Sequence, residues 1–361
     1  MRNDTFKSRI KKVTRLLRKK RLDALILTGG ANISYLSGFF GDDSWLILAG
    51  SAAILVTDSR YTLQAKRECR ACRIYERKGS MTEAVADVLK KLSAGRAIAV
   101  EDKIELAVFN VLRKKIGRRL KTAGGLVESV RQIKDKFEIA AIKKAIKISE
   151  KALAKVLRKI HIGISETEVA AILDFEIKKY GGQPAFETIA AFGSNSAMAH
   201  HRPTAKKLKK VDTILIDFGA KVNGYCCDMT RCFAVGRVSD LYAKAYKVVF
   251  EAQTAVIKAV KAGIKAKRVD NIARNIIIES KFPPYGHGLG HGVGLEVHEQ
   301  PVVSVKSKAA LRQGNVITIE PAVYIAGKFG IRIEDDVLIT KNGCKVLSSR
   351  LKTAKVPLLK V

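Results

Sequence analysis

The sequence predicts two domains: an α/β domain over residues 1–125, and a larger domain of helices and strands over residues 126–361. Three observations support this division. A chain of 361 residues is long enough to form two hydrophobic cores. Short apolar runs alternate with helical patterns up to about residue 120, which is typical of an α/β domain. Gly124 and Gly125 then mark a boundary between the two patterns.

The first domain is expected to begin with a basic amphipathic helix. The first twenty residues have the charge of a mitochondrial transit peptide, but the pattern runs directly into a strand, so we interpret them as the first helix of the domain. Further helices are expected near Thr82–Leu92 and up to about Leu120. The expected strands are Leu22–Gly29, Ser44–Gly50, Ala52–Tyr61 and Ala97–Asp102.

The second domain is expected to begin with a long helix from Asp135 to about Ile160. A capping box at Ser165–Glu168 predicts the start of another helix, which ends before Gly181. Asn223–Gly224 predicts a hairpin between strands Val211–Ala220 and Tyr225–Val235. The remaining expected elements are helices at Ser239–Ala262 and Lys267–Lys281, and strands at Asn315–Glu320 and Gly330–Ile339.

The net charge of +33 arises from 67 Lys and Arg against 34 Asp and Glu. These cations are spread through both halves, whereas a dedicated nucleic-acid module concentrates them on one element. We therefore expect any nucleic-acid binding to be weak, salt-sensitive and independent of sequence. The six cysteines form neither a disulfide framework nor a complete zinc site, which favours reduced thiols in a cytoplasmic protein. No apolar run reaches the length of a membrane span.

The stretch Pro284–Pro301 (PYGHGLGHGVGLEVHEQP) holds three of the six histidines, at His287, His291 and His298, among five glycines. Glycines allow the backbone to approach a ligand closely, and histidines bind metals or carry protons near neutral pH. We interpret the stretch as the wall of an active site. A plain glycine-rich connection is the alternative.

Four carboxylates follow or accompany apolar strands: Asp217, Asp228, Glu320 and Glu334. Taken singly, each could be a strand-end acid paired with Arg231, Arg332 or Lys345. Taken together with a glycine-framed histidine, they indicate a metal site, because grouped buried carboxylates repel one another unless a cation neutralises them. Four carboxylates and one imidazole exceed the needs of one ion, so two divalent ions are expected.

The order of Asp217, Asp228, His291 in GHGVG, Glu320 in TIEP and Glu334 in RIED resembles the pita-bread metallopeptidases, and within them the Xaa-Pro aminopeptidases and Xaa-Pro dipeptidases. The resemblance implies an α+β pita-bread catalytic domain with pseudo-two-fold symmetry, preceded by a creatinase-like N-terminal α/β domain. By the same resemblance, Asp217 holds the first metal ion and His291 and Glu320 the second. Asp228 and Glu334 would bridge the two ions, and Glu320 would also act as base or proton shuttle for the metal-held water.

The resemblance also assigns residues on the substrate side of the site. His200 and His298 would stabilise the developing oxyanion, and His287 would face the substrate pocket. Arg332, on the same side, would orient the carboxylates. His201, the neighbour of His200, is left out of the site.

The implied activity is metal-dependent hydrolysis of the peptide bond preceding proline in short peptides. Mn²⁺ is the first expectation for the metal, with Co²⁺ and Zn²⁺ as alternatives. The Xaa-Pro dipeptidases that the sequence resembles tend to hold the product carboxylate with an arginine soon after the His-Glu pair. No arginine follows Glu299 closely here, which favours an Xaa-Pro aminopeptidase over a strict dipeptidase. The alternative function is that of a non-catalytic pita-bread protein that binds nucleic acid or another anionic partner. A homodimer that does not associate with membranes is also expected.

Overall fold

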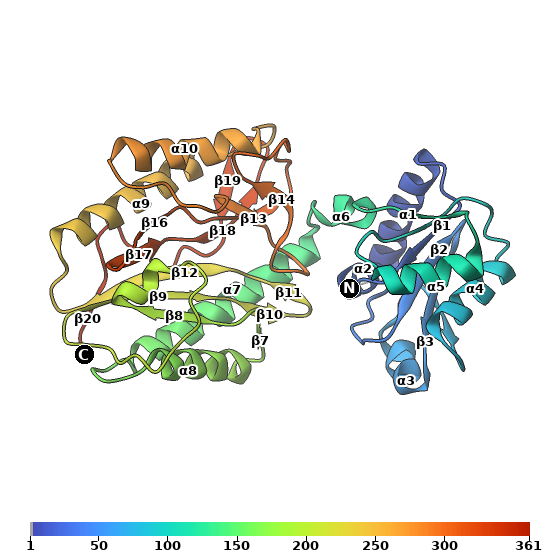
Figure 1. The fold of residues 1–361 in the computed structure, drawn as a ribbon, viewed down its shortest axis with the longest axis horizontal. Helices are drawn as coiled ribbons and strands as arrows, with labels where there is room; N and C mark the ends of the chain where they lie inside the picture. The colour runs from blue at the N-terminus through green and yellow to red at the C-terminus, as the bar shows by residue number, and fades with distance from the viewer. Residues whose placement is uncertain (1–2) are drawn as a thin grey trace. The chain divides into compact units, whose positions relative to one another are not determined.

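The computed structural model describes residues 3–361, which form two compact units, Met1–Arg131 and Gln132–Val361 (Figure 1). The boundary lies six residues after the expected one at Gly125. The intervening helix α6 (Leu126–Arg131) packs on α1 (Asn3–Lys19) and α2 (Gly30–Ser37), and therefore belongs to the first unit. Within the described residues, no helix has both the length and the apolarity needed to cross a membrane.

The first unit is built on one mixed sheet with the strand order β4-β3-β2-β1-β5-β6. The pairs β1–β2 and β2–β3 are antiparallel, and the outer pairs are parallel. The strands are β1 (Ala24–Leu27), β2 (Trp45–Ala49), β3 (Ala52–Thr57), β4 (Arg73–Glu76), β5 (Ile98–Val100) and β6 (Leu120–Thr122). The remaining helices are α3 (Ser59–Glu68), α4 (Met81–Lys91) and α5 (Leu106–Ile116).

The first unit differs from the expected elements in two details. Residues Gly30–Ser37 form helix α2, which was not among the expected helices, and Gly38 ends that helix in the left-handed conformation with φ of +83°. Strand β3 ends at Thr57 instead of continuing to Tyr61. Asp58 causes this early end, because its side chain accepts the backbone N–H of Arg60 and caps α3.

The second unit contains two helix pairs that lie on opposite sides of its strands (Figure 1): α7 (Lys136–Leu157) with α8 (Glu166–Lys179), and α9 (Asp240–Ala259) with α10 (Ala266–Glu279). The capping box expected at Ser165 is present and starts α8. In both pairs the connecting turn uses a glycine at φ of +91°, Gly163 and Gly263. The same turn therefore occurs in both helix pairs, as expected for two halves related by a pseudo-two-fold axis.

A bent antiparallel ribbon lies between the helix pairs. Strand β9 (Asp212–Phe218) pairs with β12 (Met229–Val235), and β10 (Ala220–Val222) pairs with β11 (Tyr225–Cys226). The hairpin predicted at Asn223–Gly224 is therefore confirmed, but both arms break, at Gly219 and at Cys227–Asp228. A Cβ atom on Gly219 would lie 1.9 Å from the carbonyl oxygen of Cys227, so only glycine fits this bend.

A second bent ribbon has the same construction. Strand β15 (Val316–Ile319) pairs with β18 (Asp335–Ile339), and β16 (Ala322–Ile325) pairs with β17 (Phe329–Arg332). The single strand expected over Gly330–Ile339 was therefore wrong, because β17 and β18 belong to different sheets. The opposite arm breaks at Glu320–Pro321, where proline has no N–H to donate to a ladder.

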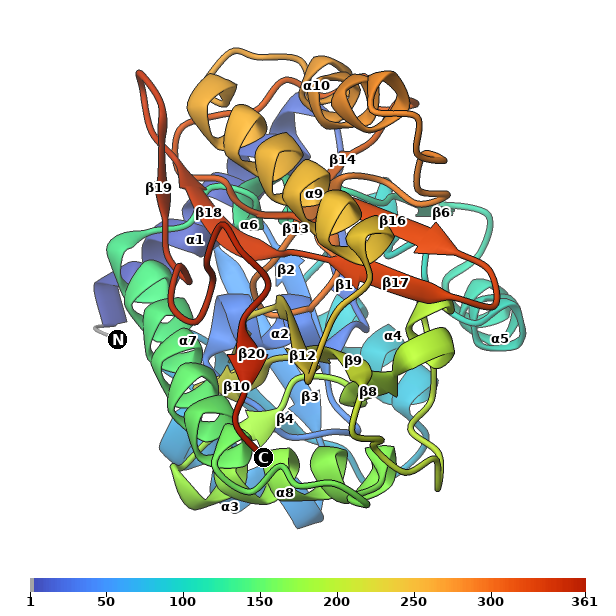
Figure 2. The same ribbon diagram turned by 90° about the vertical axis from the view of Figure 1, so that its left-hand side faces the viewer.

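The ribbons take part in the two main sheets of the second unit, β20-β12-β9-β8 and β14-β13-β15-β18-β19. Figure 2 shows α9 crossing in front of the β16–β17 arm, which it contacts. A small sheet, β11-β10-β7, completes the unit. Its remaining elements are β7 (Gln183–Pro184), β8 (Ile189–Phe192), the 3₁₀ helix η1 (Gly193–Ala197), β13 (Gly290–Gly292), β14 (Glu299–Val303), β19 (Cys344–Val346) and β20 (Leu358–Leu359).

Candidate metal centre and cleft

The four carboxylates singled out in the sequence all lie at or beside the breaks of the two bent ribbons. Asp217 stands near the end of β9, and Asp228 directly precedes β12. Glu320 follows β15, and Glu334 lies between β17 and β18. Two groups of residues bring their ligand atoms within 4.8 Å of one another, and Glu334 belongs to both. These groups are Asp217, Asp228 and Glu334, and His291, Glu320 and Glu334.

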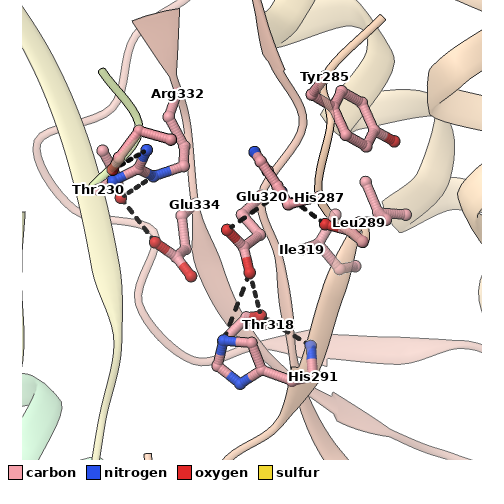
Figure 3. A network of polar contacts seen from close by, with 12 residues as sticks. Thr230, Tyr285, His287, Leu289, His291, Thr318, Ile319, Glu320, Arg332 and Glu334 are labelled. Carbon is pink, nitrogen blue, oxygen red and sulfur yellow. Dashed lines mark hydrogen bonds and ion pairs between the residues drawn. The ribbon is translucent and has the colours of Figure 1, made fainter. Parts of the chain in front are cut away.

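His291 faces this cluster because strand β13 holds its ring in place (Figure 3). The backbone N–H of His291 donates to Thr318 Oγ1 at 3.1 Å, and the ring Nδ1–H donates to the Gly292 carbonyl at 3.1 Å. The ring Nε2 then lies 3.3 Å from Glu320 Oε1 and 3.6 Å from Asp228 Oδ2. An imidazole oriented in this way presents its free nitrogen to the carboxylates.

The electrostatics of the cluster call for a cation. Burial, with the charges of Glu334 and Asp217, raises the pKa of Asp228 well above its ordinary value. Burial, with the charges of Glu320 and Asp217, does the same to the pKa of Glu334. The Oδ1 atoms of Asp217 and Asp228 are buried and find no hydrogen-bond partner among the described residues. Buried oxygens without donors, grouped around one imidazole, fit divalent metal ions that accept oxygen and nitrogen ligands.

Glu320 and His291 behave differently from the other ligands. Burial acts to raise the pKa of Glu320, but the hydrogen bond from His291 and the nearby His287 and Arg332 lower it overall. Burial acts to lower the pKa of His291, but Glu320 raises it overall. Without metal, the pair therefore favours an ionised carboxylate and a protonated ring. A metal ion at Nε2 would replace that proton.

Arg332 fixes the orientation of two carboxylates, and Figure 3 shows its link through Thr230 to one of them, Glu334. Its Nη2 donates to Asp217 Oδ2 at 2.6 Å, and its Nε donates to Thr230 Oγ1 at 3.0 Å. The Thr230 hydroxyl in turn donates to Glu334 Oε2 at 2.6 Å. Arg332 thus pairs with Asp217. For this one acid, the arginine pairing that was considered as the alternative to a metal site is present. Arg231 instead pairs with Asp335 at 2.9 Å.

Sequence reasoning did not identify Thr230, Tyr324 or Asp336. The Tyr324 hydroxyl accepts from Arg332 Nη1 at 2.7 Å and lies 3.2 Å from His287 Nε2. Asp336 Oδ2 accepts the backbone N–H of Asp228 at 3.1 Å, and burial raises the pKa of Asp336 to about 7. The acidic run after Glu334 was a signal for Asp336. A single Thr or Tyr within a strand gives no comparable signal.

The remaining histidines of the sequence analysis divide into two kinds. The rings of His298 and His291 meet edge to face at 4.3 Å, and Asp228, His291 and His298 form a third group of ligand atoms within 4.8 Å. His200 is exposed and lies in the same cavity. His201, which the sequence analysis left out of the site, also lines this cavity, but it is buried and its Nε2 lies 2.9 Å from Glu166 Oε2.

These residues line a cavity of about 620 Å³ in the second unit, called the cleft below. All nine site residues expected from the sequence line it: His200, Asp217, Asp228, His287, His291, His298, Glu320, Arg332 and Glu334. Other side chains of the wall include Phe186, Glu187, Ile189, Arg202, Val297 and Val302. Buried carboxylates at one end and apolar side chains beside them suit a ligand with both a polarised and an apolar part.

Comparisons with known proteins identify both units. Residues 140–341 match the model of metallopeptidase family M24, and residues 9–133 match the creatinase/prolidase N-terminal domain. The chain is similar to an Xaa-Pro dipeptidase of Pyrococcus horikoshii, with 37% identity over 350 residues, 96% of this chain and 98% of that protein.

Solved structures show the same likeness over nearly the full length. An Xaa-Pro dipeptidase from Bacillus anthracis superposes with a TM-score of 0.94 at 32% identity, covering 98% of this chain and 99% of that one. An X-Pro aminopeptidase from Thermotoga maritima superposes with a TM-score of 0.89 at 35% identity, covering 97% of this chain and 99% of that one.

Proposed function

This chain belongs to metallopeptidase family M24, and from that premise we propose that it hydrolyses the peptide bond preceding proline in short peptides, with two divalent metal ions. One observation carries the proposal. The five residues expected as metal ligands meet in a single cleft, together with four further histidines and an apolar wall. The relatives named Xaa-Pro dipeptidase and X-Pro aminopeptidase support the choice of proline peptides.

Family membership confirms the expected fold class, a creatinase-like α/β domain followed by a pita-bread catalytic domain. It also confirms that the chain is a metallopeptidase. The alternative of a non-catalytic protein that binds nucleic acid finds no support, because such a protein is expected to have lost ligands. Here all five are present, and they lie together.

The residues proposed to hold the metal ions are Asp217, Asp228, His291, Glu320 and Glu334. Their donor set of oxygens with one nitrogen suits Mn²⁺, which we propose as the preferred ion, with Co²⁺ and Zn²⁺ as alternatives. When bound, such ions supply Lewis acidity that lowers the pKa of water and polarises a carbonyl group. Arg332 and Thr230 keep Asp217 and Glu334 aimed at this position.

The chain's own side chains would move the proton and stabilise the oxyanion. The lowered pKa of Glu320 keeps this carboxylate ionised at neutral pH, so it can accept a proton and pass it to the leaving proline nitrogen. Burial, with the charge of His291, lowers the pKa of His298, so the ring is neutral and can donate one N–H to an oxyanion. His200 is proposed as the second donor.

His287 is proposed to shape the substrate side of the cleft. Its Nδ1–H donates to the Gly288 carbonyl at 2.7 Å, which leaves Nε2 to accept from the Tyr324 hydroxyl. Burial lowers the pKa of this ring. The imidazole ring of His287 is therefore neutral and held in one orientation. It forms part of the cleft wall, and the leaving proline would pack beside it.

The length of the preferred substrate is the finer part of the proposal. The sequence favoured an aminopeptidase, because no arginine follows Glu299 closely. The relatives carry either name, at similar levels of identity. We therefore propose both dipeptides and longer peptides with proline in the second position as substrates.

Chelation tests the proposed function. The purified protein is stripped of metal with a chelator, dialysed, and assayed on an Xaa-Pro dipeptide and on Xaa-Pro-Yaa. The expected result is loss of cleavage on stripping and recovery on adding Mn²⁺ or Co²⁺. Asp228→Asn is the matched control, because the variant is expected to stay inactive whichever ion is added. Full cleavage in chelator would exclude the proposed mechanism.

Two further expectations are tested in solution. We propose a homodimer in the cytoplasm that binds nucleic acid at most weakly. Light scattering after size-exclusion chromatography measures the mass, which is 39.6 kDa for one chain. Fluorescence anisotropy with a labelled oligonucleotide at two salt concentrations measures the binding of nucleic acid.

A further inference from the structure

Helix α7 carries a row of lysines along its outer side. Lysine recurs at every fourth residue, and each of these side chains is exposed: Lys143, Lys147, Lys151 and Lys155. Because residues four apart lie on one face of an α-helix, this spacing places them in one line, called the lysine row below. The row spans about 18 Å of helix axis. Figure 2 shows α7 at the outside of the second unit.

The protein itself does not neutralise the lysine row. Within residues 3–361, none of these ammonium groups forms an ion pair with a carboxylate. The two acids of α7 lie elsewhere: Glu138 belongs to the capping box at the start of the helix, and Glu150 Oε2 lies 3.7 Å from Arg350 Nε. Lys159, four residues after the row, is paired, with its Nζ 3.2 Å from Glu176 Oε1. Like charges four residues apart on a helix repel one another, and an anionic ligand would relieve this repulsion.

Helix α9 has the corresponding place in the other helix pair and lacks such a row. Its exposed lysines, Lys244, Lys247 and Lys258, are not spaced by four residues. One of them is answered by an acid on the same helix, because Lys247 Nζ lies 3.8 Å from Glu251 Oε1. The row on α7 therefore does not simply follow from the net charge of +33, which both helices share.

A second basic segment lies against the turn that follows α7. The Gly163 N–H donates to the Leu208 carbonyl at 2.9 Å, and the Leu208 N–H donates to the Ile164 carbonyl at 2.8 Å. These bonds hold the exposed side chains of Lys209 and Lys210 near the C-terminal end of α7. Positive charge therefore continues beyond the end of the helix.

We propose that the lysine row binds the phosphate backbone of double-stranded nucleic acid, weakly and without regard to sequence. A duplex carries one negative charge per about 1.7 Å of its axis, so about ten phosphates lie along the 18 Å of the row. The row lies outside the cleft, since none of its lysines is among the residues that line it. The inference therefore goes beyond the proposed peptidase activity and does not depend on it.

Two features of α7 favour a duplex over other polyanions. A membrane-surface helix needs a free apolar face, but the apolar face of α7 is buried, with Ile142, Ile146 and Leu153 among its residues. Single-stranded nucleic acid is held chiefly by bases that stack on aromatic rings. The one aromatic residue of α7, Phe137, lies six residues before the row begins, so phosphate contacts must carry the binding.

Fluorescence anisotropy with a labelled DNA duplex of about 20 base pairs, in KCl from about 25 to 200 mM, tests the proposal. The variant combines Lys147→Gln, Lys151→Gln and Lys155→Gln. We expect its binding at about 50 mM KCl to be at least about tenfold weaker than that of the wild-type protein. The slope of log K against log salt should become shallower by about 2.5, because three phosphate contacts are lost.

The matched control removes three charges from α9 with Lys244→Gln, Lys247→Gln and Lys258→Gln. It has the same net charge as the α7 variant, and its affinity for the duplex should stay within about twofold of the wild-type value. The α7 variant should keep or raise Tm, because repulsion within the row is removed. Its kcat and KM for Leu-Pro should not change. Lys151→Gln alone, with an expected change in slope of about 0.9, repeats the test with a smaller perturbation.

Three results would overturn the proposal. The first is no binding of the duplex by the wild-type protein at the lowest salt concentration. The second is equal weakening in the α7 and α9 variants, which would show that net charge alone sets the affinity. The third is a sedimentation assay in which vesicles of phosphatidylserine and phosphatidylcholine lose binding to the α7 variant while the duplex does not. Failure to cleave Leu-Pro would count against the proposed function alone.

Discussion

Arg332 Nη2 lies 2.6 Å from Asp217 Oδ2, in a pair whose arginine side chain is 4% exposed and whose aspartate side chain is 13% exposed. The pair joins the two bent ribbons, because Asp217 comes from β9 and Arg332 from β17. The other oxygen of Asp217, Oδ1, is buried and finds no donor among the described residues. The guanidinium therefore selects which oxygen of Asp217 remains for a metal ion.

Arg332→Lys tests this orienting contact. A lysine keeps the charge but cannot hold Asp217, Thr230 and Tyr324 at once, because its ammonium group is a single point donor. We expect Mn²⁺ affinity to fall by about 10- to 100-fold, the usual effect of losing a group that orients a metal ligand. Calorimetric titration of the metal-free protein measures the affinity, and circular dichroism checks the fold. Unchanged affinity in a folded variant would contradict the assigned role.

A substitution at Thr230 tests the same hydrogen-bond network with a smaller change of side-chain shape. Thr230→Val preserves the side-chain shape but removes the hydroxyl that donates to Glu334 and accepts from Arg332. We expect a loss of about 1–3 kcal/mol in the free energy of unfolding, because two buried groups lose a partner. Weaker Mn²⁺ binding should accompany this loss. Thr230→Ser, which retains the hydroxyl, is the control, and equal effects of both variants would argue against the hydrogen bonds.

These partners explain where sequence-based prediction succeeded and where it failed. An acid after an apolar run is visible in the sequence, so Asp217 and Glu320 could be selected without coordinates. The break between Arg332 and Asp335 could not be foreseen, since GIRIEDDVLI reads as one apolar strand. The break depends on the pairing of β17 and β18 with two different partner strands, which is a property of the tertiary structure.

The pKa shifts of the cluster predict how the metal-free protein responds to pH. Burial and neighbouring charges raise the pKa values of Asp228 and Glu334 well above normal, and burial raises that of Asp336 to about 7. Between the ordinary pKa and the raised one, the unfolded chain has lost these protons and the folded chain retains them. Raising the pH therefore favours unfolding. Glu320, His287 and His298, whose pKa values are lowered, act in the opposite direction. Glu320 does so mainly below pH 5, and the two imidazoles are outnumbered by Asp228, Glu334, Asp336 and His291, whose pKa values are raised.

We therefore expect the Tm of the metal-free protein to fall as pH rises from about 5 to 7. Each unit of pKa shift corresponds to about 1.4 kcal/mol. Because bound Mn²⁺ holds the ligands in their ionised form, the increase in Tm on adding Mn²⁺ should grow over the same pH range. Differential scanning calorimetry at matched ionic strength measures both curves. A Tm that rises with pH in chelator would show that the cluster does not retain protons.

The adjacent histidines His200 and His201 are expected to give opposite results on substitution. His200→Ala should lower kcat by about 10²–10³-fold, if the ring donates to the oxyanion, and should leave Tm unchanged because the side chain is exposed. His201→Ala should lower Tm, because buried Glu166 loses a partner at 2.9 Å. Steady-state kinetics and thermal unfolding on both variants decide the assignment. A large fall in kcat for His201→Ala alone would reverse it.

We predict that the bend at Gly219 in the first ribbon is necessary for the metal centre. A Cβ atom at this position would lie 1.9 Å from the backbone carbonyl oxygen of Cys227, and a backbone atom cannot rotate away as a side chain can. Gly219→Ala must therefore push apart the two arms that carry Asp217 and Asp228. We expect a loss of about 1–3 kcal/mol in the free energy of unfolding, measured in urea, and weaker Mn²⁺ binding.

Gly286→Ala is the matched control for this substitution. Gly286 belongs to the glycine-rich stretch beside the cleft, but apart from its own chain neighbours no described residue lies within 4 Å of the position that its Cβ would take. This variant should retain both stability and Mn²⁺ affinity. If Gly219→Ala also retains them, the ribbon tolerates a straighter path, and the convergence of Asp217 and Asp228 does not depend on the bend. If both variants lose metal affinity, added bulk near the cleft explains the effect better than the bend at Gly219.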